Sequence, residues 1–129
     1  MNSKQFLMVG GIILLVLGVL GLVLPSGQIL GDSWYLTPGE NMAHLVLGVV
    51  ALAAAYMADA KTQKMLTQVV AVVALFFGVY GFVVGGNPPL NTFGLANLET
   101  PYDHLLHLVV GAWAGYVGWF VKSSGAAKA

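Results

Sequence analysis

The sequence predicts an all-α integral membrane protein, a four-transmembrane-helix bundle built from two tandem helical hairpins of the same orientation. Hydrophobic residues make up 58% of the chain and charged residues 8%, and the mean hydropathy is +0.84. About a quarter of a soluble globular chain is charged, so this chain has too few charges to cover a soluble fold. Four long apolar runs are present, and the second half of the chain repeats motifs of the first. We expect the 129 residues to form a single membrane domain.

Each of the four apolar runs approaches the about 20 residues that a helix needs to cross a bilayer. None of them contains Lys, Asp or Glu. The first run is expected to be a retained span rather than a signal peptide, because no small-residue cleavage site follows it and Pro25-Ser26-Gly27 is typical of a helix stop. The runs are Phe6–Leu24, roughly Met42–Ala58, Val69–Val84 and Leu105–Val121.

The distribution of lysines predicts that both termini lie in the cytoplasm, because cytoplasmic segments of membrane proteins carry an excess of Lys and Arg. The connections Pro25–Asn41 and Gly85–His104 contain no lysine and no arginine, and are therefore expected to lie outside. The lysines all fall in the N-terminus, the middle connection or the C-terminal tail, and they are Lys4, Lys61, Lys64, Lys122 and Lys128.

The outer connections are expected to lie against the membrane surface. The stretch Asn87–Pro101 is long for a structureless loop, so we expect it to fold over the outer helix ends with a short helical turn. The tail 122–129 is small and polar and is expected to be flexible. Aromatic residues of the outer connections suit a membrane-interface belt, and they are Trp34, Tyr35, Phe93 and Tyr102.

The chain contains an internal repeat. The segments Thr37–Gly48 and Thr100–Gly111 share the pattern Thr-Pro-x-Asp/Glu-x-x-x-His-Leu-Val-x-Gly. We expect repeat 1 to span about 5–58 and repeat 2 about 67–121, each forming one helical hairpin. A pseudo-twofold axis along the membrane normal would relate the two hairpins.

Part of the repeated motif has a structural explanation at the start of a helix. Thr37 is a good N-cap, Pro38 suits the first helical position, and Glu40 completes a capping box. Thr100 and Asp103 are expected to do the same for the last helix. Both carboxylates also suit the positive ends of the helix dipoles.

Glycines in the second and fourth runs are expected to be sites of close helix contact. Gly48 and Gly111 hold equivalent places in the two repeats. Gly111 and Gly115 have the small-x-x-x-small spacing that lets membrane helices approach each other closely.

Three histidines are the candidate ligand-binding residues. His44 and His107 occupy equivalent places in the two repeats, about 10 Å along their helices from the N-cap. Each lies four residues before a glycine, so we expect the two imidazoles to approach each other if the glycine faces turn inward. His104 lies close to His107 along the chain, and Asn41 holds the equivalent place in the first repeat.

Two explanations of these histidines stay open. In the first, each imidazole donates a hydrogen bond to the carboxylate one turn earlier, Glu40 or Asp103, or to a neighbouring helix, and so stabilises the bundle. In the second, His44 and His107, with or without His104, hold a metal, haem or chlorin pigment between the second and fourth helices. The Glu-x-x-His pairs of a ferritin-type di-iron site are missing.

The two histidine motifs also carry a resemblance. They read Asn41-x-x-His44-Leu45-x-x-Gly48 and Asp103-His104-x-Leu106-His107-Leu108-x-x-Gly111. These motifs resemble the repeated signatures N-x-x-H-L-x-x-G and D-N-x-L-H-L-x-x-G of a family of small bacterial four-helix membrane proteins, the domain of unknown function 4383. The resemblance covers roughly Phe6 to Val121, and His104 stands where the family more often has Asn. It implies a four-helix topology and a bacterial membrane, and no activity.

The sequence favours a structural or interaction role over catalysis. It has no cysteine, no Ser–His–Asp arrangement and no phosphate-binding loop, so we expect no enzyme. With zero net charge and no arginine, no nucleic-acid partner is expected. The leading hypothesis is a small accessory subunit of a larger membrane complex or of a homo-oligomer, in a bacterial plasma-type membrane. The alternative is the histidine-based binding module, and a transporter is disfavoured because the spans offer almost no polar path.

Overall fold

The structure, a computed structural model, describes residues 1–25, 28, 37–84, 91–92, 96–97 and 102–122. The first helix, α1 (Ser3–Val23), begins at a capping box that the sequence analysis did not predict. The Asn2 side chain accepts a hydrogen bond from the Gln5 backbone N–H at 2.9 Å, and the Gln5 side chain accepts one from the Asn2 N–H at 3.0 Å. Two backbone donors that a helix start leaves without intrahelical partners are thereby satisfied.

The second helix, α2 (Pro38–Met57), begins with the capping box that its sequence predicts. The Glu40 N–H donates to Thr37 Oγ1 at 3.3 Å, and the Thr37 N–H donates to Glu40 Oε1 at 3.3 Å. Pro38 stands at the start of the helix, where its missing N–H loses no hydrogen bond. The Thr-Pro-x-Glu pattern is therefore a helix-start signal in the first repeat.

The third helix, α3 (Ala60–Val84), begins well before the predicted run, which corrects the predicted middle loop. Asp59 accepts a hydrogen bond at 2.8 Å from the backbone N–H three residues later and so caps the helix. Lys61 and Lys64, expected in a loop, lie in the first turns of α3. A search for apolar runs misses these turns because their residues are polar, although several of them favour helix.

Gln63 ties the end of α2 to the start of α3. Its side chain is 4% exposed, and its Nε2 lies 3.1, 3.0 and 3.2 Å from the carbonyl oxygens of Ala54, Ala55 and Ala58. The hydroxyl of the buried Thr67 donates in turn to the Gln63 carbonyl at 2.9 Å. Carbonyl groups at the end of a helix lack intrahelical partners, so this amide satisfies part of that need at the hairpin junction.

The fourth helix, α4 (Tyr102–Phe120), follows a short strand pair. β1 (Asn91–Thr92) and β2 (Ala96–Asn97) are antiparallel, with Asn91 opposite Asn97. The described residues of the connection 87–101 thus form strands where a helical turn was expected. The predictions for several other residues lie outside the described part of the chain, and these residues are Thr100, Trp34, Tyr35, Phe93 and the tail 123–129.

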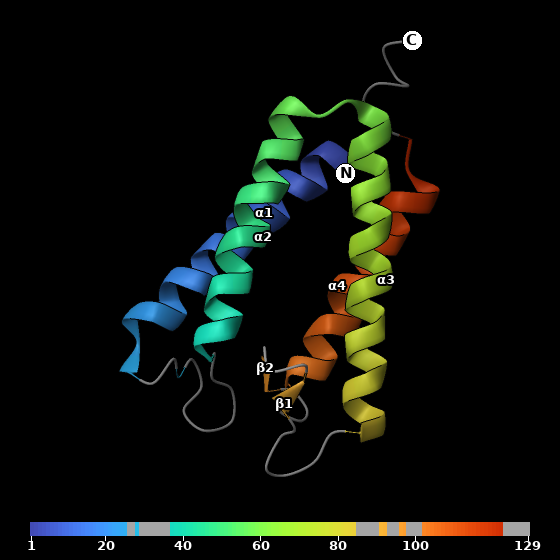
Figure 1. Ribbon diagram of the computed structural model, residues 1–129. Helices are drawn as coiled ribbons and strands as arrows, with labels where there is room; N and C mark the ends of the chain where they lie inside the picture. The colour runs from blue at the N-terminus through green and yellow to red at the C-terminus, as the bar shows by residue number, and fades with distance from the viewer. Residues whose placement is uncertain (26–27, 29–36, 85–90, 93–95, 98–101, 123–129) are drawn as a thin grey trace.

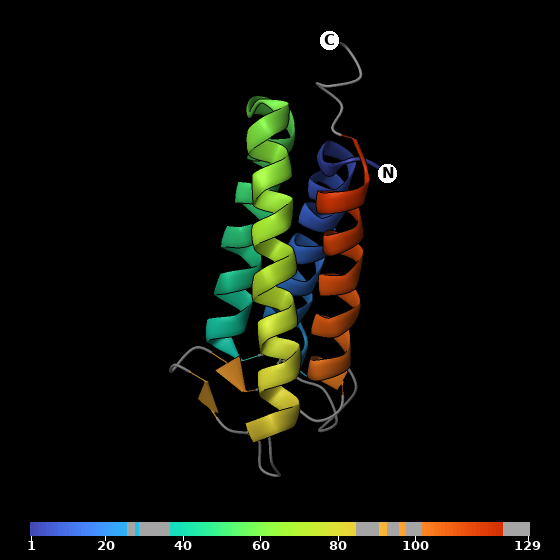
Figure 2. The same ribbon diagram turned by 90° about the vertical axis from the view of Figure 1, so that its right-hand side faces the viewer.

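The helices form two antiparallel hairpins, α1–α2 and α3–α4, that stand side by side (Figures 1 and 2). The N-terminus, the end of α4 and the α2–α3 connection lie at one end, here called the lysine end, and the opposite end is called the loop end. In Figure 1 the hairpins meet at the lysine end and diverge toward the loop end. The described lysines that define the lysine end are Lys4, Lys61, Lys64 and Lys122.

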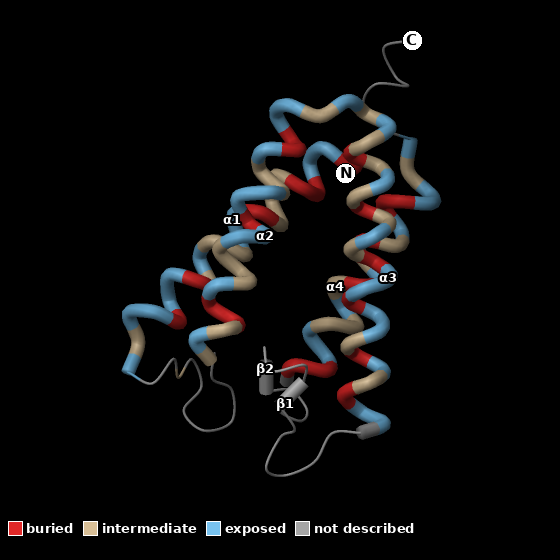
Figure 3. The backbone as a smooth tube through the Cα atoms, in the orientation of Figure 1, coloured by how far each residue is buried: buried red, intermediate tan, exposed pale blue. Residues whose placement is uncertain are grey.

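The core that the two hairpins share lies near the lysine end. There the Phe6 ring of α1 meets the Trp113 ring of α4 edge to face, with centroids 4.6 Å apart. Figure 3 shows that other buried segments follow the contact line inside each hairpin. The shared core is small, and its buried members are Phe6, Leu7, Ala54, Ala55, Ala71, Ala114 and Val117.

The fold class is confirmed as an all-α membrane bundle of four helices. Three of them, α1, α2 and α3, are long and apolar enough to cross a membrane. The first turns of α4 carry Asp103, His104 and His107, which makes this helix less apolar, and its crossing stays a prediction. Large apolar side chains point outward from all four helices, as Met57 at 85% and Phe120 at 81% exposed illustrate.

Candidate functional site

The first hairpin is held by a seam in which glycines of one helix receive side chains of the other. A Cβ added at Gly18 would stand 2.6 Å from Leu45 Cγ, and one added at Gly21 would overlap the Asn41 side chain. In the reverse direction, a Cβ added at Gly48 would stand 2.9 Å from a backbone carbonyl oxygen of α1. Small residues let membrane helices approach this closely. The α2 side of the seam is therefore the stripe formed by Asn41, Leu45 and Gly48.

The second hairpin makes matching contacts at the corresponding positions. A Cβ added at Gly78 would stand 2.6 Å from Leu108 Cδ2, and one added at Gly81 would overlap the His104 ring. At Gly111 the added atom would stand 2.6 Å from a leucine side chain of α3. His104 thus takes the place in the second seam that Asn41 takes in the first.

The seams show which helix the glycine faces of α2 and α4 meet. The expected approach of His44 and His107 depended on these faces turning toward the pseudo-twofold axis. They turn instead to the partner helix of the same hairpin, where a neighbouring backbone comes close enough to require glycine. His104 lies inside its seam, with its ring 0% exposed and edge-on to Phe82 at a centroid distance of 4.9 Å.

Gly115 makes a looser contact with α3 than Gly111 does. The nearest atoms that an added Cβ would meet there lie at 3.9 Å, an ordinary van der Waals distance. Gly118, one turn later, is the tight position, because an added Cβ would stand 2.9 Å from Gln68 Cγ. The small-x-x-x-small spacing alone does not show at which of these glycines α4 lies closest to α3.

His107 is half-buried, and its Nδ1 lies 2.6 Å from the backbone carbonyl oxygen of Asp103. A carbonyl oxygen only accepts, so Nδ1 carries the hydrogen in this contact. The hydrogen-bond partner is therefore the main chain of Asp103, whereas the structural explanation anticipated its carboxylate. On the other side, the ring lies 5.9 Å from the Phe77 ring of α3.

His44 is half-buried on α2, and its Nδ1 is a buried atom without a hydrogen-bond partner among the described residues. Its charge interacts electrostatically with those of His107 and Asp103 on α4. His44 belongs to the first hairpin and His107 to the second, so this interaction runs between the hairpins.

The candidate carboxylates lie at the starts of helices. Glu40 is part of the capping box with Thr37, and Asp103 is 4% exposed in the first turn of α4. Asn41, also 4% exposed, belongs to the first seam. Sequence reasoning named all these residues but did not see that Asn41 and His104 fill glycine sites. The sequence did contain a signal for this role. Asn41 and His104 are each followed by the same pattern, x-x-x-Leu-x-x-Gly.

The described residues do not form a metal-binding cluster. No group of three or more His, Asp or Glu side chains lies close enough together in this part of the chain to hold a metal ion. Two imidazoles and a nearby carboxylate can exchange protons, and one imidazole can serve as an axial ligand of a flat ring. These are the two kinds of chemistry that the His44–His107 pair supports.

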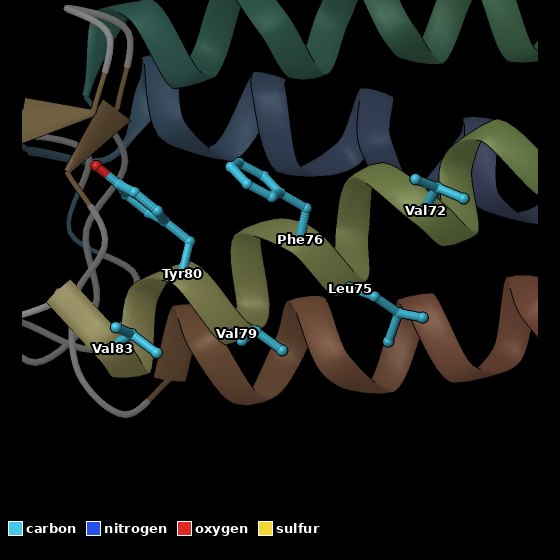
Figure 4. Close-up of a pocket in the computed structure, with 6 residues that line it drawn as sticks. All are labelled: Val72, Leu75, Phe76, Val79, Tyr80 and Val83. Carbon is cyan, nitrogen blue, oxygen red and sulfur yellow. The ribbon is translucent and has the colours of Figure 1, made fainter.

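A shallow apolar hollow of about 430 Å³ runs along one side of α3 (Figure 4). All the residues that line it come from this one helix, so it is a feature of the bundle surface rather than a cavity between helices. It is open and offers one polar group, the Tyr80 hydroxyl. The lining residues are Val72, Leu75, Phe76, Val79, Tyr80 and Val83.

The fold and the seams define a class: small four-helix membrane proteins whose buried polar side chains serve contacts inside helical hairpins. A family model described as Domain of unknown function (DUF4383) matches residues 4–120, and the chain belongs to this family. No curated protein matches the chain, and no solved structure matches it. The resemblance seen in the sequence is thereby confirmed at the level of the family, while the role of the repeated histidine motifs stays a prediction.

Proposed function

We propose that the protein is a small non-catalytic membrane subunit that binds through its apolar helix faces to a larger membrane complex or to copies of itself. The observation that carries this proposal is where the polar side chains are used. Asn41 and His104 fill glycine sites within their hairpins, and Gln63 binds the end of α2. The outward faces are left apolar, including the α3 hollow shown in Figure 4.

The proposed setting is the plasma-type membrane of a bacterium, with both termini in the cytoplasm. The distribution of lysines supports this orientation, because every described lysine lies at the lysine end. We also propose that the two hairpins are copies of one ancestral unit. The matching contacts of Gly21 with Asn41 and of Gly81 with His104 support this origin.

Native mass spectrometry of the tagged chain, extracted from its own membranes in mild detergent, tests the proposal. We expect the chain to appear bound to further copies or to a larger membrane protein in fixed stoichiometry. A harsher detergent should then release the bare chain at its sequence mass. A chain that appears alone and bare in the mildest detergent would contradict the subunit role.

A second function is favoured by one observation, the buried and unpartnered Nδ1 of His44 near His107. We propose as the alternative a binding module in which His44 and His107 hold a small ligand between α2 and α4. Haem or a chlorin fits better than a bare metal ion, because one axial histidine suffices for such a ring.

The same spectra separate the two functions. The alternative predicts an added mass of a metal, haem or pigment that is lost in His44→Ala and in His107→Ala. His104→Asn is the matched control, because the first hairpin already carries Asn at the corresponding place. Retention of the added mass in both alanine variants would rule out the histidine module.

A further inference from the structure

A second hollow, of about 250 Å³, lies in the lysine-end half of the second hairpin, where α3 and α4 run side by side (Figures 1 and 2). Here called the lysine-end hollow, it has walls from two helices, whereas the hollow in Figure 4 is lined by α3 alone. Its α4 wall is the side chain of Trp119. Its α3 wall is a row of side chains at helical spacing, and they are Met65, Gln68, Val69, Val72 and Val73.

Two contacts hold the walls of the lysine-end hollow in place. The Gln68 side chain donates from Nε2 to the carbonyl oxygen of Gly118 at 2.9 Å, and so ties α3 to α4 beside the hollow. The Trp119 ring lies next to Gly115, because a Cβ added at this glycine would stand 3.9 Å from two carbons of the ring. The indole is therefore directed back along α4, away from the lysine end, as long helical side chains commonly are.

The dimensions of the lysine-end hollow suit a hydrocarbon chain. From Met65 to Val73 the helix α3 rises about 12 Å. One leaflet of a bilayer core is about 15 Å thick, half of the whole core. The one polar side chain in the lining, Gln68, is already bound to α4. The hollow therefore offers an apolar surface over most of the depth of one leaflet.

Two lysines follow the same face of α3 toward the lysine end. Lys61 stands four residues before Met65, and Lys64 stands four residues before Gln68. Residues at this spacing are neighbours on a helix surface. The Cα–Cβ bonds of a helix tilt toward its N-terminus, which for α3 is the lysine end. Both side chains therefore lean from the apolar hollow toward the membrane surface, where lysines place their amines in water or among lipid head groups.

The lysine end carries an excess of positive charge among the described residues. Asp59 is the one carboxylate there, and it is engaged in the cap of α3. The other described carboxylates, Glu40 and Asp103, lie at the loop end. Against Asp59 stand four cationic side chains, and they are Lys4, Lys61, Lys64 and Lys122. This charge is complementary to an anionic head group.

We propose that the lysine-end hollow binds one anionic phospholipid, with its phosphate against Lys61 and Lys64 and one acyl chain along Trp119. A basic site beside an apolar surface between membrane helices is the arrangement that recognises such lipids. A soluble phosphate would leave the apolar walls uncovered, and a zwitterionic lipid would leave the lysine charges unbalanced. The proposal goes beyond the proposed function, because it assigns a ligand that the chain can hold alone or within an assembly.

A lipid titration followed by native mass spectrometry tests the site. The full chain is purified in a non-ionic detergent and stripped of lipid, and it is then titrated with dioleoyl phosphatidylglycerol or dioleoyl phosphatidylcholine. The two lipids have the same acyl chains and differ in the charge of the head group. A lysine near an anionic lipid surface contributes about a fivefold gain in affinity. We therefore expect one phosphatidylglycerol to bind at least about tenfold more tightly than phosphatidylcholine.

One pair of variants tests the head-group contact. Lys64→Gln should weaken phosphatidylglycerol binding about fivefold and leave phosphatidylcholine binding unchanged. Lys4→Gln is the matched control, because it removes the same charge from the same end of the molecule but from α1, which does not line the hollow. Equal binding of the two lipids by the native chain would overturn the proposal, and so would equal effects of the two variants.

A second pair of variants tests the place of the acyl chain. Val69→Trp fills the lysine-end hollow, whereas Val79→Trp makes the same change in the hollow of Figure 4. Val69 is 50% and Val79 is 56% exposed, so neither change disturbs the core. We expect Val69→Trp to reduce phosphatidylglycerol binding at least about fivefold and Val79→Trp to leave it unchanged, since only the first occupies the proposed site. Equal binding by the two variants would place the lipid elsewhere and overturn the proposal.

Discussion

At the scale of single residues, the tightest contacts in the protein join a polar side chain to a glycine. Asn41 covers Gly21 in the first hairpin, and His104 covers Gly81 in the second. Neither glycine has room for a methyl group. The polar residue therefore stabilises its hairpin by shape, because its volume fills the gap that the glycine leaves.

Replacing either glycine with alanine should destabilise its hairpin. In Gly21→Ala and Gly81→Ala the new methyl group would overlap Asn41 or His104, so we expect a loss of about 1–3 kcal/mol, as in other overfilled cores. Thermal unfolding of the purified protein in detergent measures the loss.

Gly10→Ala is the matched control for both variants. No heavy atom lies within 4 Å of the place where its Cβ would stand. We expect this variant to be as stable as the native chain, or slightly more stable, because alanine favours helix over glycine. Equal stability of Gly10→Ala and Gly81→Ala would show that the seam does not hold the hairpin.

The sequence was a better guide to these residues than to their roles. The repeat singled out Asn41, His104, His44 and His107 as equivalent pairs. Helical spacing shows which residues share a face, but it does not show which neighbouring helix that face meets. From the sequence, the glycine faces could therefore meet either the other hairpin or the partner helix of the same hairpin, and they meet the partner helix.

At the scale of elements, each of the first three helices begins with a side chain that binds a backbone N–H. Asn2 begins α1, Thr37 begins α2 and Asp59 begins α3. Thr37 could be predicted, because a proline and a glutamate complete its pattern. Asn2 and Asp59 were missed because the helix boundaries were taken from the apolar runs, and a membrane helix continues into water beyond its apolar part.

The cap of α3 should weaken in acid. Hydrogen bonds from the Thr62 side chain and backbone, together with the Lys61 charge, lower the pKa of Asp59 below its ordinary value. A carboxylate whose pKa is lower in the folded state contributes stability that is full above its ordinary pKa and is lost as the pH falls through the lowered value. We therefore expect the first turn of α3 to lose protection below the ordinary Asp range, with little change near neutral pH.

Amide hydrogen exchange at Thr62 and Gln63 measures this loss. The matched variant is Asp59→Asn, which keeps an oxygen acceptor for the cap but carries no charge. Its protection, corrected for the intrinsic effect of pH on exchange, should not depend on acidification. If native and variant chains show the same profile, the Asp59 charge does not stabilise the helix start.

At the scale of the whole molecule, the two ends of the bundle differ both in their charged residues and in how closely the hairpins pack. The lysine end holds the described lysines and the shared core, whereas the loop end holds the His44–His107 pair. The hairpin pairing of the four helices could be predicted from the apolar runs and the repeat. The divergence of the hairpins could not, because the apolar pattern of a lipid-facing helix is the same whether its neighbour lies close or far away.

The proposed orientation predicts which end is accessible from outside the cell. Pro25→Cys places a thiol at the loop end, and Lys61→Cys places one at the lysine end. In intact cells, a membrane-impermeant maleimide should label Pro25→Cys and leave Lys61→Cys unlabelled, since the proposed orientation places the lysine end in the cytoplasm. Both should be labelled once the membrane is opened. The reverse pattern in intact cells would invert the orientation.

The seams inside the hairpins also bear on how the protein is made. The first hairpin holds both sides of its seam within Ser3–Met57, so its helices can reach their final contacts while the ribosome is still adding α3 and α4. The small core at the lysine end and the Gln63 hydrogen bonds to the end of α2 have to wait for the second hairpin. Insertion into the bilayer can therefore proceed in two independent steps. A gene cut at the Ala58–Asp59 junction would yield two polypeptides, each carrying a complete seam.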